Sequence, residues 1–325
     1  MDSDYGRQRP AQVSVGEMTE QKNNIKQTYI MMIKKSLTLI AALALMLTGC
    51  SNEENSPSNV TKGTPIKVNA FVEELTGGLS NKTEVTGSNF SQFCLQITNT
   101  GNADFSYYAW MKHDATTNAW KAYTDNTYTE ELPMYWAGDN NDVIVTAASF
   151  DFKDLMAISP DFANDQTDEA NFTKNDFLLR QPISVEQSDK GIEVLLSHIM
   201  ATFTVNINLG TGVTDENNPV TDMKISGPDC ARRLVMQEYN RYEWRDGESA
   251  NKLDITPHFV SYTKGDATTS AKVTYEAFVM PQSLEAGNME ISFTYGGKPY
   301  TYSTEQDITF AENTPYSMTL NMPTE

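Results

Sequence analysis

From residue 64 onward, the chain consists of short runs rich in Val, Ile, Thr, Tyr and Phe, separated by Gly, Asn, Asp and Pro. β-Branched and aromatic side chains suit a pleated, half-buried surface, and the separating residues suit turns. This pattern restricts the chain to β structure built from many short strands. No repeat of fixed period is visible in the sequence, which argues against a solenoid or a propeller.

Individual strands follow from the periodicity of apolar residues. Residues 66–72 (IKVNAFV) predict a strand with one apolar face, whereas 142–150 (DVIVTAASF) are almost continuously apolar and predict a strand in a buried core. The pair Gly296-Gly297 between 289–295 and PYTYS predicts a tight β-hairpin. Further strands are predicted at 197–209, 272–280 and 315–322; in the last of these, the side chains that face one way are Tyr316, Met318, Leu320 and Met322.

Helices are expected to be few and short, with two turns at 151–159 and one turn at 175–181. The length of 325 residues, 39% of them hydrophobic, suits two domains of ordinary size. The polar segment 187–191 (QSDKG) is the predicted linker. The sequence therefore predicts an all-β fold with two tandem β-sandwich domains of Ig-like or transthyretin-like Greek-key type, at 63–188 and 189–325.

The charge of the chain is strongly acidic. Lys and Arg number 24 against 43 Asp and Glu, and residues 1–49 hold 6 of the basic and 4 of the acidic groups. The part after residue 49 therefore carries 18 minus 39, or −21. Such a surface repels a phosphate backbone, which argues against nucleic-acid binding and suits an extracytoplasmic protein.

An apolar run of 11 residues, 37–47, follows Lys34 and Lys35. It is too short to span a bilayer of about 30 Å as a helix, and it has the layout of a signal peptide. The run ends in Leu47-Thr48-Gly49-Cys50, which resembles the lipobox of bacterial lipoproteins. This resemblance implies cleavage before Cys50 and attachment of acyl chains such as palmitate. Several chains, at about 0.8 kcal/mol per buried CH₂, hold a soluble domain at a membrane.

The segments around this signal follow from its position. Residues 1–30 are polar, so the chain more sensibly starts at the methionine pair 31–32, and 1–30 is a mis-assigned or disordered extension. Residues 31–49 are then the lipoprotein signal peptide and 50–62 a solvated tether. Acidic residues just after Cys50 resemble the signal that sends lipoproteins of Bacteroidetes to the outside of the outer membrane; a plain acidic tether is the alternative.

Residues typical of catalytic or metal sites are scattered. The three histidines lie far apart, and no nucleophile, phosphate-binding or zinc-ligand motif is present in the sequence. The acidic loops 138–143 and 160–170 could hold calcium through oxygen ligands, but they lack EF-hand spacing, and the favoured interpretation is solvated turns. Cys94 and Cys230 are expected to be buried free thiols. We expect no enzyme activity, no cofactor and no metal, although the abundant carboxylates leave a glycosidase pair open.

Aromatic residues gather around a predicted turn at 114–118. They flank this turn on both sides and comprise Tyr107, Trp110, Trp120 and Tyr123. One interpretation is ordinary packing within a hairpin. The other is a ligand surface, in which exposed rings stack on sugars or insert into a partner.

Several segments, in this order, resemble the fimbrillin-like proteins of Bacteroidales, a family of pilins and fimbrial accessory lipoproteins. The first is the lipobox with Cys50. The second, 132–150, has a tryptophan followed by a strand that ends in alanines and an aromatic residue. The third, 192–207 (IEVLLSHIMATFTVNI), is similar to a histidine-containing strand that opens the second domain of the family. The last is a Pro-Gln turn with a terminal hairpin at 276–303, followed by 313–322.

The resemblance implies a two-domain β-sandwich that is exported as a lipoprotein precursor. In stalk subunits of this family, a surface protease cuts after a basic residue and frees the first strand. A strand of the neighbouring subunit then fills the groove, which is donor-strand exchange. His198, within the third segment, sits between Ser197 and Ile199 in a predicted apolar strand, so we expect a buried structural histidine and not a ligand or base.

The sequence departs from the stalk pattern in two places. No arginine lies between Cys50 and Arg180, so arginine-specific cleavage of the first strand has no substrate; Lys62, Lys67 and Lys82 remain as candidate sites. Only three residues follow the last predicted strand, which leaves little for a donor arm. Both departures favour an anchor, tip or adhesive accessory subunit.

The favoured hypothesis is a surface-exposed lipoprotein that is a fimbrial subunit or accessory component in adhesion, assembling by donor-strand exchange or surface contact. Its expected location is the outer membrane at the cell surface or the fimbrium. Its expected partners are the membrane through the lipid on Cys50, other fimbrial subunits, and surface receptors or glycans, but not nucleic acid. The alternative is a glycan-binding cell-surface lipoprotein.

Overall fold

The computed structural model describes residues 61–73, 82–84 (backbone only), 90–139, 141–153, 157–237, 241–246 and 253–322. Residues 58–325 form one compact unit. The predicted signal peptide and Cys50 lie outside the described residues, as does most of the tether. Within the described ranges, no helix has both the length and the apolar character needed to cross a membrane.

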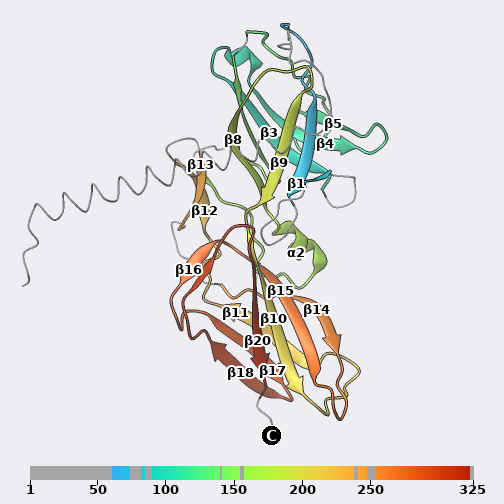
Figure 1. Ribbon diagram of the computed structural model, residues 1–325, viewed down its shortest axis with the longest axis vertical. Helices are drawn as coiled ribbons and strands as arrows, with labels where there is room; N and C mark the ends of the chain where they lie inside the picture. The colour runs from blue at the N-terminus through green and yellow to red at the C-terminus, as the bar shows by residue number, and fades with distance from the viewer. Residues whose placement is uncertain are drawn as a thin grey trace, which may run out of the picture. The chain divides into compact units, whose positions relative to one another are not determined.

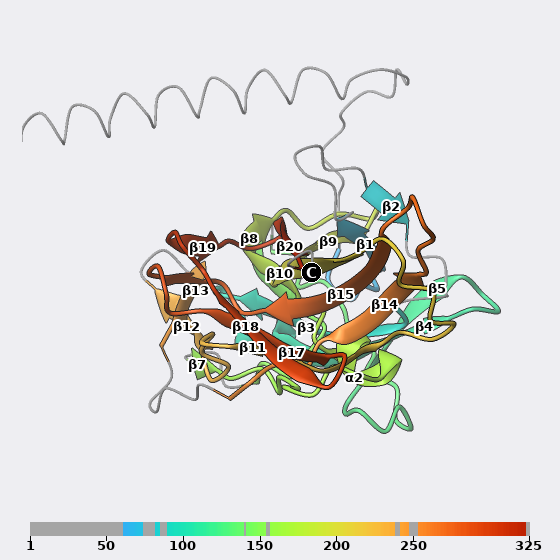
Figure 2. The ribbon, with the colours of Figure 1, turned by 90° about the horizontal axis from the view of Figure 1, so that it is seen from below.

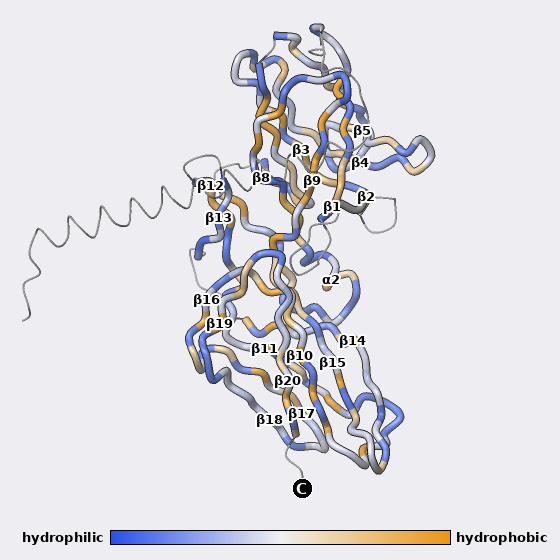
Figure 3. The backbone as a smooth tube through the Cα atoms, viewed as in Figure 1, coloured by the Kyte–Doolittle hydropathy of each residue, from blue (hydrophilic) through white to orange (hydrophobic). Residues whose placement is uncertain are grey.

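Eight strands form the first sheet, in the order β2-β1-β9-β8-β6-β3-β4-β5 (Figure 1). They are β1 (Val68–Glu73), β2 (Lys82–Glu84), β3 (Gln92–Asn99), β4 (Tyr107–Asp114), β5 (Ala119–Tyr123), β6 (Val143–Ala148), β8 (Leu178–Val185) and β9 (Ile192–His198). β1 runs parallel to β9, and the other neighbouring pairs are antiparallel. Their inward side chains build a first core, and Figure 3 shows hydrophobic residues concentrated on β3 and β9.

A second group of strands contains a four-stranded sheet of order β14-β15-β10-β20, a three-stranded sheet of order β11-β17-β18 and the pair β16-β19. These strands are β10 (Ala201–Gly210), β11 (Val220–Ser226), β14 (His258–Thr263), β15 (Ala271–Val279), β16 (Gln282–Leu284), β17 (Glu290–Tyr295), β18 (Lys298–Ser303), β19 (Ile308–Phe310) and β20 (Pro315–Asn321). The larger two sheets form two layers (Figure 2) and share a second core that includes Phe203, Val273 and Phe293.

A third core connects the two groups of strands. It contains Leu179 of the first sheet and Phe278 of the four-stranded sheet. The fully buried side chain of Gln166 accepts a hydrogen bond from the backbone N–H of Phe278 (2.9 Å) and donates one to its carbonyl (3.1 Å). Four further elements contribute residues to this third core: β7 (Ala157–Ile158), α2 (Glu169–Lys174), β12 (Arg233–Gln237) and β13 (Arg241–Arg245). The short 3₁₀ helix η1 (Ala103–Phe105) instead follows the end of β3 in the first sheet.

The all-β prediction is confirmed, and the division into two tandem sandwich domains stays a prediction. The hairpin at Gly296-Gly297 is present, because these residues have φ of 58° and 74° and join Tyr295 directly to its partner Lys298. Left-handed backbone at both positions explains why glycines occupy this turn. The inward face predicted for the last strand is also confirmed by the burial of its even-numbered side chains.

Both helix predictions are wrong. In 151–159 the described residues contain β7 instead, and the side chain of Asp151 accepts a hydrogen bond from the N–H of Lys153, which favours a turn. In 175–181 the strand β8 begins at Leu178. The apolar pair Leu178-Leu179 fits a strand because one side chain enters the first core and the other enters the third.

The single α-helix of the described residues overlaps the acidic loop 160–170, which the sequence suggested to be a solvated turn. Helix α2 begins after Asp168, whose side chain accepts a hydrogen bond from the N–H of Asn171 at 2.8 Å. Aspartate is a favoured N-cap because it satisfies a free N–H of the first turn. At six residues, the helix is too short to give a clear apolar period.

The predicted linker is also in the wrong place. Residues 187–191 join β8 to β9, which are neighbours in the same sheet. The chain passes from the first sheet to the four-stranded sheet at Ile199-Met200, which divides the strand predicted at 197–209. Both residues are buried in the third core, so this passage carries none of the polar composition that suggests a linker.

Candidate functional site: the first strand and the aromatic hairpin

The first strand, β1, is a fully integrated member of its sheet. It pairs in parallel with β9 from Val68 opposite Ile192 to Val72 opposite Leu196, and the two strands lie side by side in Figure 1. Val68 and Ala70 are buried in the first core together with the inward residues of β9. Removal of β1 would therefore uncover apolar side chains and a row of backbone groups on β9.

The chain entering β1 is held by the segment around Trp136. The N–H of Gly63 donates to the carbonyl of Trp136 at 3.0 Å, and the N–H of Trp136 donates to the carbonyl of Thr64 at 2.9 Å. The indole of Trp136 is 1% exposed, and its Nε1–H donates to the carbonyl of Ser188 at 2.9 Å. One buried ring thus connects the entry of β1 to the β8–β9 connection.

The candidate cleavage sites lie on two sides of β1. Lys62 and Lys67 precede Val68, the first residue of the strand. The ammonium group of Lys62 lies 5.6 Å from the centre of the Phe105 ring. Lys82 lies beyond β1, in β2, opposite Glu73. Cleavage after Lys62 or Lys67 would leave β1 in the sheet, so among the three lysines only Lys82 is placed to release it.

The four aromatic residues of the predicted ligand surface do not form one surface. Tyr107 and Trp120 pack against the first core on the inner face of the sheet. Trp110 packs against the third core, and Tyr123 is its direct cross-strand partner, so these two lie on the outer face. Successive residues of a strand point to opposite faces, which a list of nearby aromatic residues does not reveal.

The rings on the outer face pack against their own neighbours. The rings of Tyr123 and Tyr128 meet edge to face with centres 5.5 Å apart, and Lys112 Nζ lies 4.8 Å from the centre of the Tyr128 ring. The hydroxyl of Tyr108 donates to Asp151 at 2.5 Å; burial and this hydrogen bond raise the pKa of Tyr108. Packing within the hairpin accounts for these contacts. The four aromatic residues do not share one exposed face, which the glycan-binding alternative assumed.

The histidine and cysteine side chains that could act as bases, nucleophiles or metal ligands have structural surroundings. His198 is buried, and its Nδ1 lies 2.5 Å from the Asp176 carboxylate. Burial raises the pKa of the thiols of Cys94 and Cys230 to about 12, and both are free, as expected from the sequence. Within the described part of the chain, no three His, Cys, Asp or Glu side chains are grouped to hold a metal ion.

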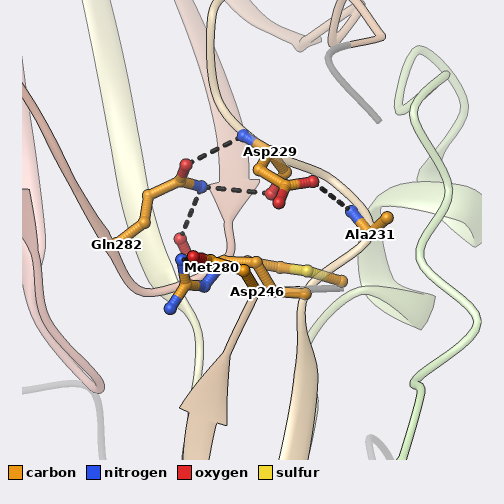
Figure 4. A network of polar contacts seen from close by, with 6 residues as sticks. Asp229, Ala231, Asp246, Met280 and Gln282 are labelled. Atoms are coloured by element: carbon orange, nitrogen blue, oxygen red, sulfur yellow. Dashed lines mark hydrogen bonds and ion pairs between the residues drawn. The ribbon is translucent and has the colours of Figure 1, made fainter. Parts of the chain in front are cut away.

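The glutamine of the Pro-Gln turn supports a loop that the sequence does not connect with it (Figure 4). Gln282 is buried and accepts a hydrogen bond from the N–H of Asp229 at 2.8 Å. Its amide nitrogen donates to the carbonyls of Asp229 and Met280, at 3.2 and 3.0 Å. The side chains of Gln282 and Gln166 thus satisfy backbone N–H and carbonyl groups that have no strand partner at these positions. In the sequence, only the proline before Gln282 indicates such a role.

Comparison with known families shows to which protein family the chain belongs. Residues 80–325 match the model of the family described as fimbrillin-like. The chain belongs to the fimbrillin-like family. Membership supports an adhesion-related surface protein with a cell-surface or fimbrial location, and neither the family nor the structural neighbours are described as enzymes.

Solved structures support the fold of this fimbrillin-like protein. A candidate cell adhesion protein of Bacteroides uniformis is 13% identical, with a TM-score of 0.52 over 80% of this chain and 94% of that chain. A candidate cell adhesion protein of Bacteroides ovatus is 10% identical, with a TM-score of 0.56 over 80% and 92% of the two chains. No curated protein matches the sequence.

Proposed function

We propose that this fimbrillin-like protein is a lipid-anchored accessory subunit, at the anchor or tip of a surface fimbrium, that takes part in adhesion and stays attached through Cys50. The observation that supports this best is the integrated strand β1, with its buried residues Val68 and Ala70. A sheet that keeps this strand offers no groove to a donor strand. Such a subunit suits the end of a filament better than its stalk.

The processing of the N-terminus tests this role. We expect mass spectrometry of the protein from outer-membrane fractions to find an N-terminal peptide that begins at Cys50, with β1 retained. A peptide that begins at Thr83 would contradict the accessory role, because cleavage after Lys82 would release β1 and open the β9 edge. In that case the protein would be a processed subunit that assembles by strand exchange, and a Lys82→Ala variant should abolish the cut.

The lipid attachment is tested separately. We expect cells that express the protein to incorporate labelled palmitate into it, and we expect Cys50→Ala to abolish the label because the lipobox thiol is the acceptor. Ser51→Ala is the matched control, since it changes the neighbouring residue and leaves the thiol in place. Label that persists in Cys50→Ala would refute the anchor.

A further inference from the structure

The four-stranded sheet has two edge strands without charged side chains. Natural edge strands are commonly protected by charged side chains, prolines or bulges, because their free backbone groups pair readily with other chains. In the described sheets, every other edge strand longer than three residues contains Lys, Arg, Asp or Glu; these strands are β5, β11, β13 and β18. The two exceptions, β14 and β20, belong to one sheet.

These two edges differ in regularity. The register of β14 against β15 shifts between Phe259 and Ser261, so a bulge interrupts this edge. β20 pairs with β10 over its whole length without a shift, from Pro315 opposite Thr202 to Asn321 opposite Asn208. The edge of β20 therefore has neither charge nor bulge, and its proline lies at its first residue.

The free backbone groups of β20 follow from its pairing with β10. The N–H of Met322 donates to the carbonyl of Asn208 at 2.9 Å, and Thr202 donates to the carbonyl of Thr314 at 3.2 Å. In a parallel pair, alternate residues direct both backbone groups to the partner, so even-numbered residues face β10. The N–H groups of Ser317, Thr319 and Asn321 face away, and they make no hydrogen bond to any residue that the structure describes.

We propose that β20 pairs with β20 of a second copy of this chain, antiparallel about a two-fold axis at Met318. This axis places Ser317 opposite Thr319 of the other copy and Pro315 opposite Asn321. The two Ser317–Thr319 pairs each exchange two backbone hydrogen bonds, and each Asn321 N–H reaches a Pro315 carbonyl, about six bonds in all. The missing N–H of proline falls at the two ends, where it costs one bond each.

The side chains suit this register. On the inner face Tyr316 lies opposite Leu320 of the second copy, and Met318 meets itself at the axis, so apolar side chains pair with apolar ones. On the outer face the exposed hydroxyls of Ser317 and Thr319 are opposite each other. Two copies of a chain with a charge of −21 after residue 49 repel at most surfaces, and this edge brings no charges together.

The geometry is self-complementary and closed. A two-fold edge-to-edge pair joins two four-stranded sheets into one continuous sheet and uses the β20 edge of both copies, so no β20 edge is left to add a third copy. One pair of seven-residue strands makes a small interface, so we expect a weak association. Crowding of the chains on a surface would favour it, because it raises their effective concentration. The inference rests on the backbone pattern of β20 and holds whether or not Cys50 carries lipid.

Association of the full chain in detergent, in a Cys50→Ser background, tests the proposal by sedimentation equilibrium. We expect a dimer whose dissociation constant rises about tenfold or more in Thr319→Lys, because the two lysines would repel each other across the axis and the cross-strand contact of Thr319 with Ser317 would be lost. Ser261→Lys, an exposed residue on the opposite edge strand β14, is the matched control and should leave the constant unchanged. A constant that is unchanged by Thr319→Lys, or changed equally by both, overturns the proposal.

Disulfide trapping tests the axis itself in the same background. Met318→Cys should form a covalent dimer under mild oxidation, because only a residue on the axis meets its own copy. Asn321→Cys, exposed on the same strand, should not, since the two thiols would lie about 20 Å apart in this register. Equal crosslinking of both variants, or none of Met318→Cys in a variant with the circular dichroism of the parent, excludes the two-fold pairing at β20.

Discussion

Replacing Gln166 by alanine should lower the free energy of unfolding of the 58–325 unit by about 2–5 kcal/mol. The side chain of Gln166 is fully buried and satisfies both the N–H and the carbonyl of Phe278. Alanine would leave both backbone groups without a partner in the third core. An unsatisfied buried group costs roughly 1–3 kcal/mol, and two are created here.

Urea unfolding followed by circular dichroism measures this loss. Gln92→Ala is the control, because Gln92 is exposed on β3 and its loss should change the free energy by less than about 0.5 kcal/mol. A cost for Gln166→Ala as small as that of the control would show that the connection between the two groups of strands does not depend on this side chain.

Replacing Trp136 by alanine should cost about 3–5 kcal/mol, among the largest effects of any single substitution in this chain. The ring fills the first core at 1% exposure, and its loss leaves a cavity that the surrounding strands only partly close. The entry of β1 would also loosen, because Gly63 and Thr64 bond to the backbone at Trp136.

Trp136→Phe separates the two contributions of the indole. Phenylalanine keeps much of the packing and loses the hydrogen bond to Ser188, so we expect a cost of about 1–2 kcal/mol. Thermal unfolding of the three proteins should therefore rank them parent, Trp136→Phe, Trp136→Ala. Equal midpoints for the two variants would contradict the cavity argument.

Local patterns in the sequence account for much of the fold. The Gly296-Gly297 hairpin is predictable because only glycine adopts left-handed backbone freely at two successive turn positions. The inward face of β20 is predictable because side chains alternate strictly along a strand. The burial of His198 follows from the apolar strand around it. The burial of Cys94 and Cys230 follows from the general tendency of free cysteines to be buried.

Features that depend on distant residues escape such patterns. The passage between the sheets at Ile199-Met200 is apolar because the third core covers it, so composition suggests a linker at 187–191 instead. Leu178 and Leu179 form a strand because two cores receive them from opposite sides, a fact absent from their local spacing.

Some features of the candidate sites can likewise be predicted from the sequence, whereas others require the structure. The lipobox at Cys50 and the lack of arginine between Cys50 and Arg180 are statements about sequence alone, because a protease and an acyltransferase recognise short segments of chain. The order of the lysines relative to β1 required the strand boundaries, which show that only Lys82 lies beyond the strand. The aromatic residues at 107–123 required the sheet, because its pleat sends Trp110 and Trp120 to opposite faces.

By itself, the sequence determined the β character of the chain, its acidity, its tight hairpin and its resemblance to fimbrillin-like proteins, because these depend on composition and on short segments taken in order. Only the tertiary structure decided that β1 lies beside β9, that Gln166 satisfies the backbone of Phe278, and that β20 is an edge strand of its four-stranded sheet. Each of these depends on which distant segment completes a row of backbone hydrogen bonds, and pairing between distant strands leaves no local signature.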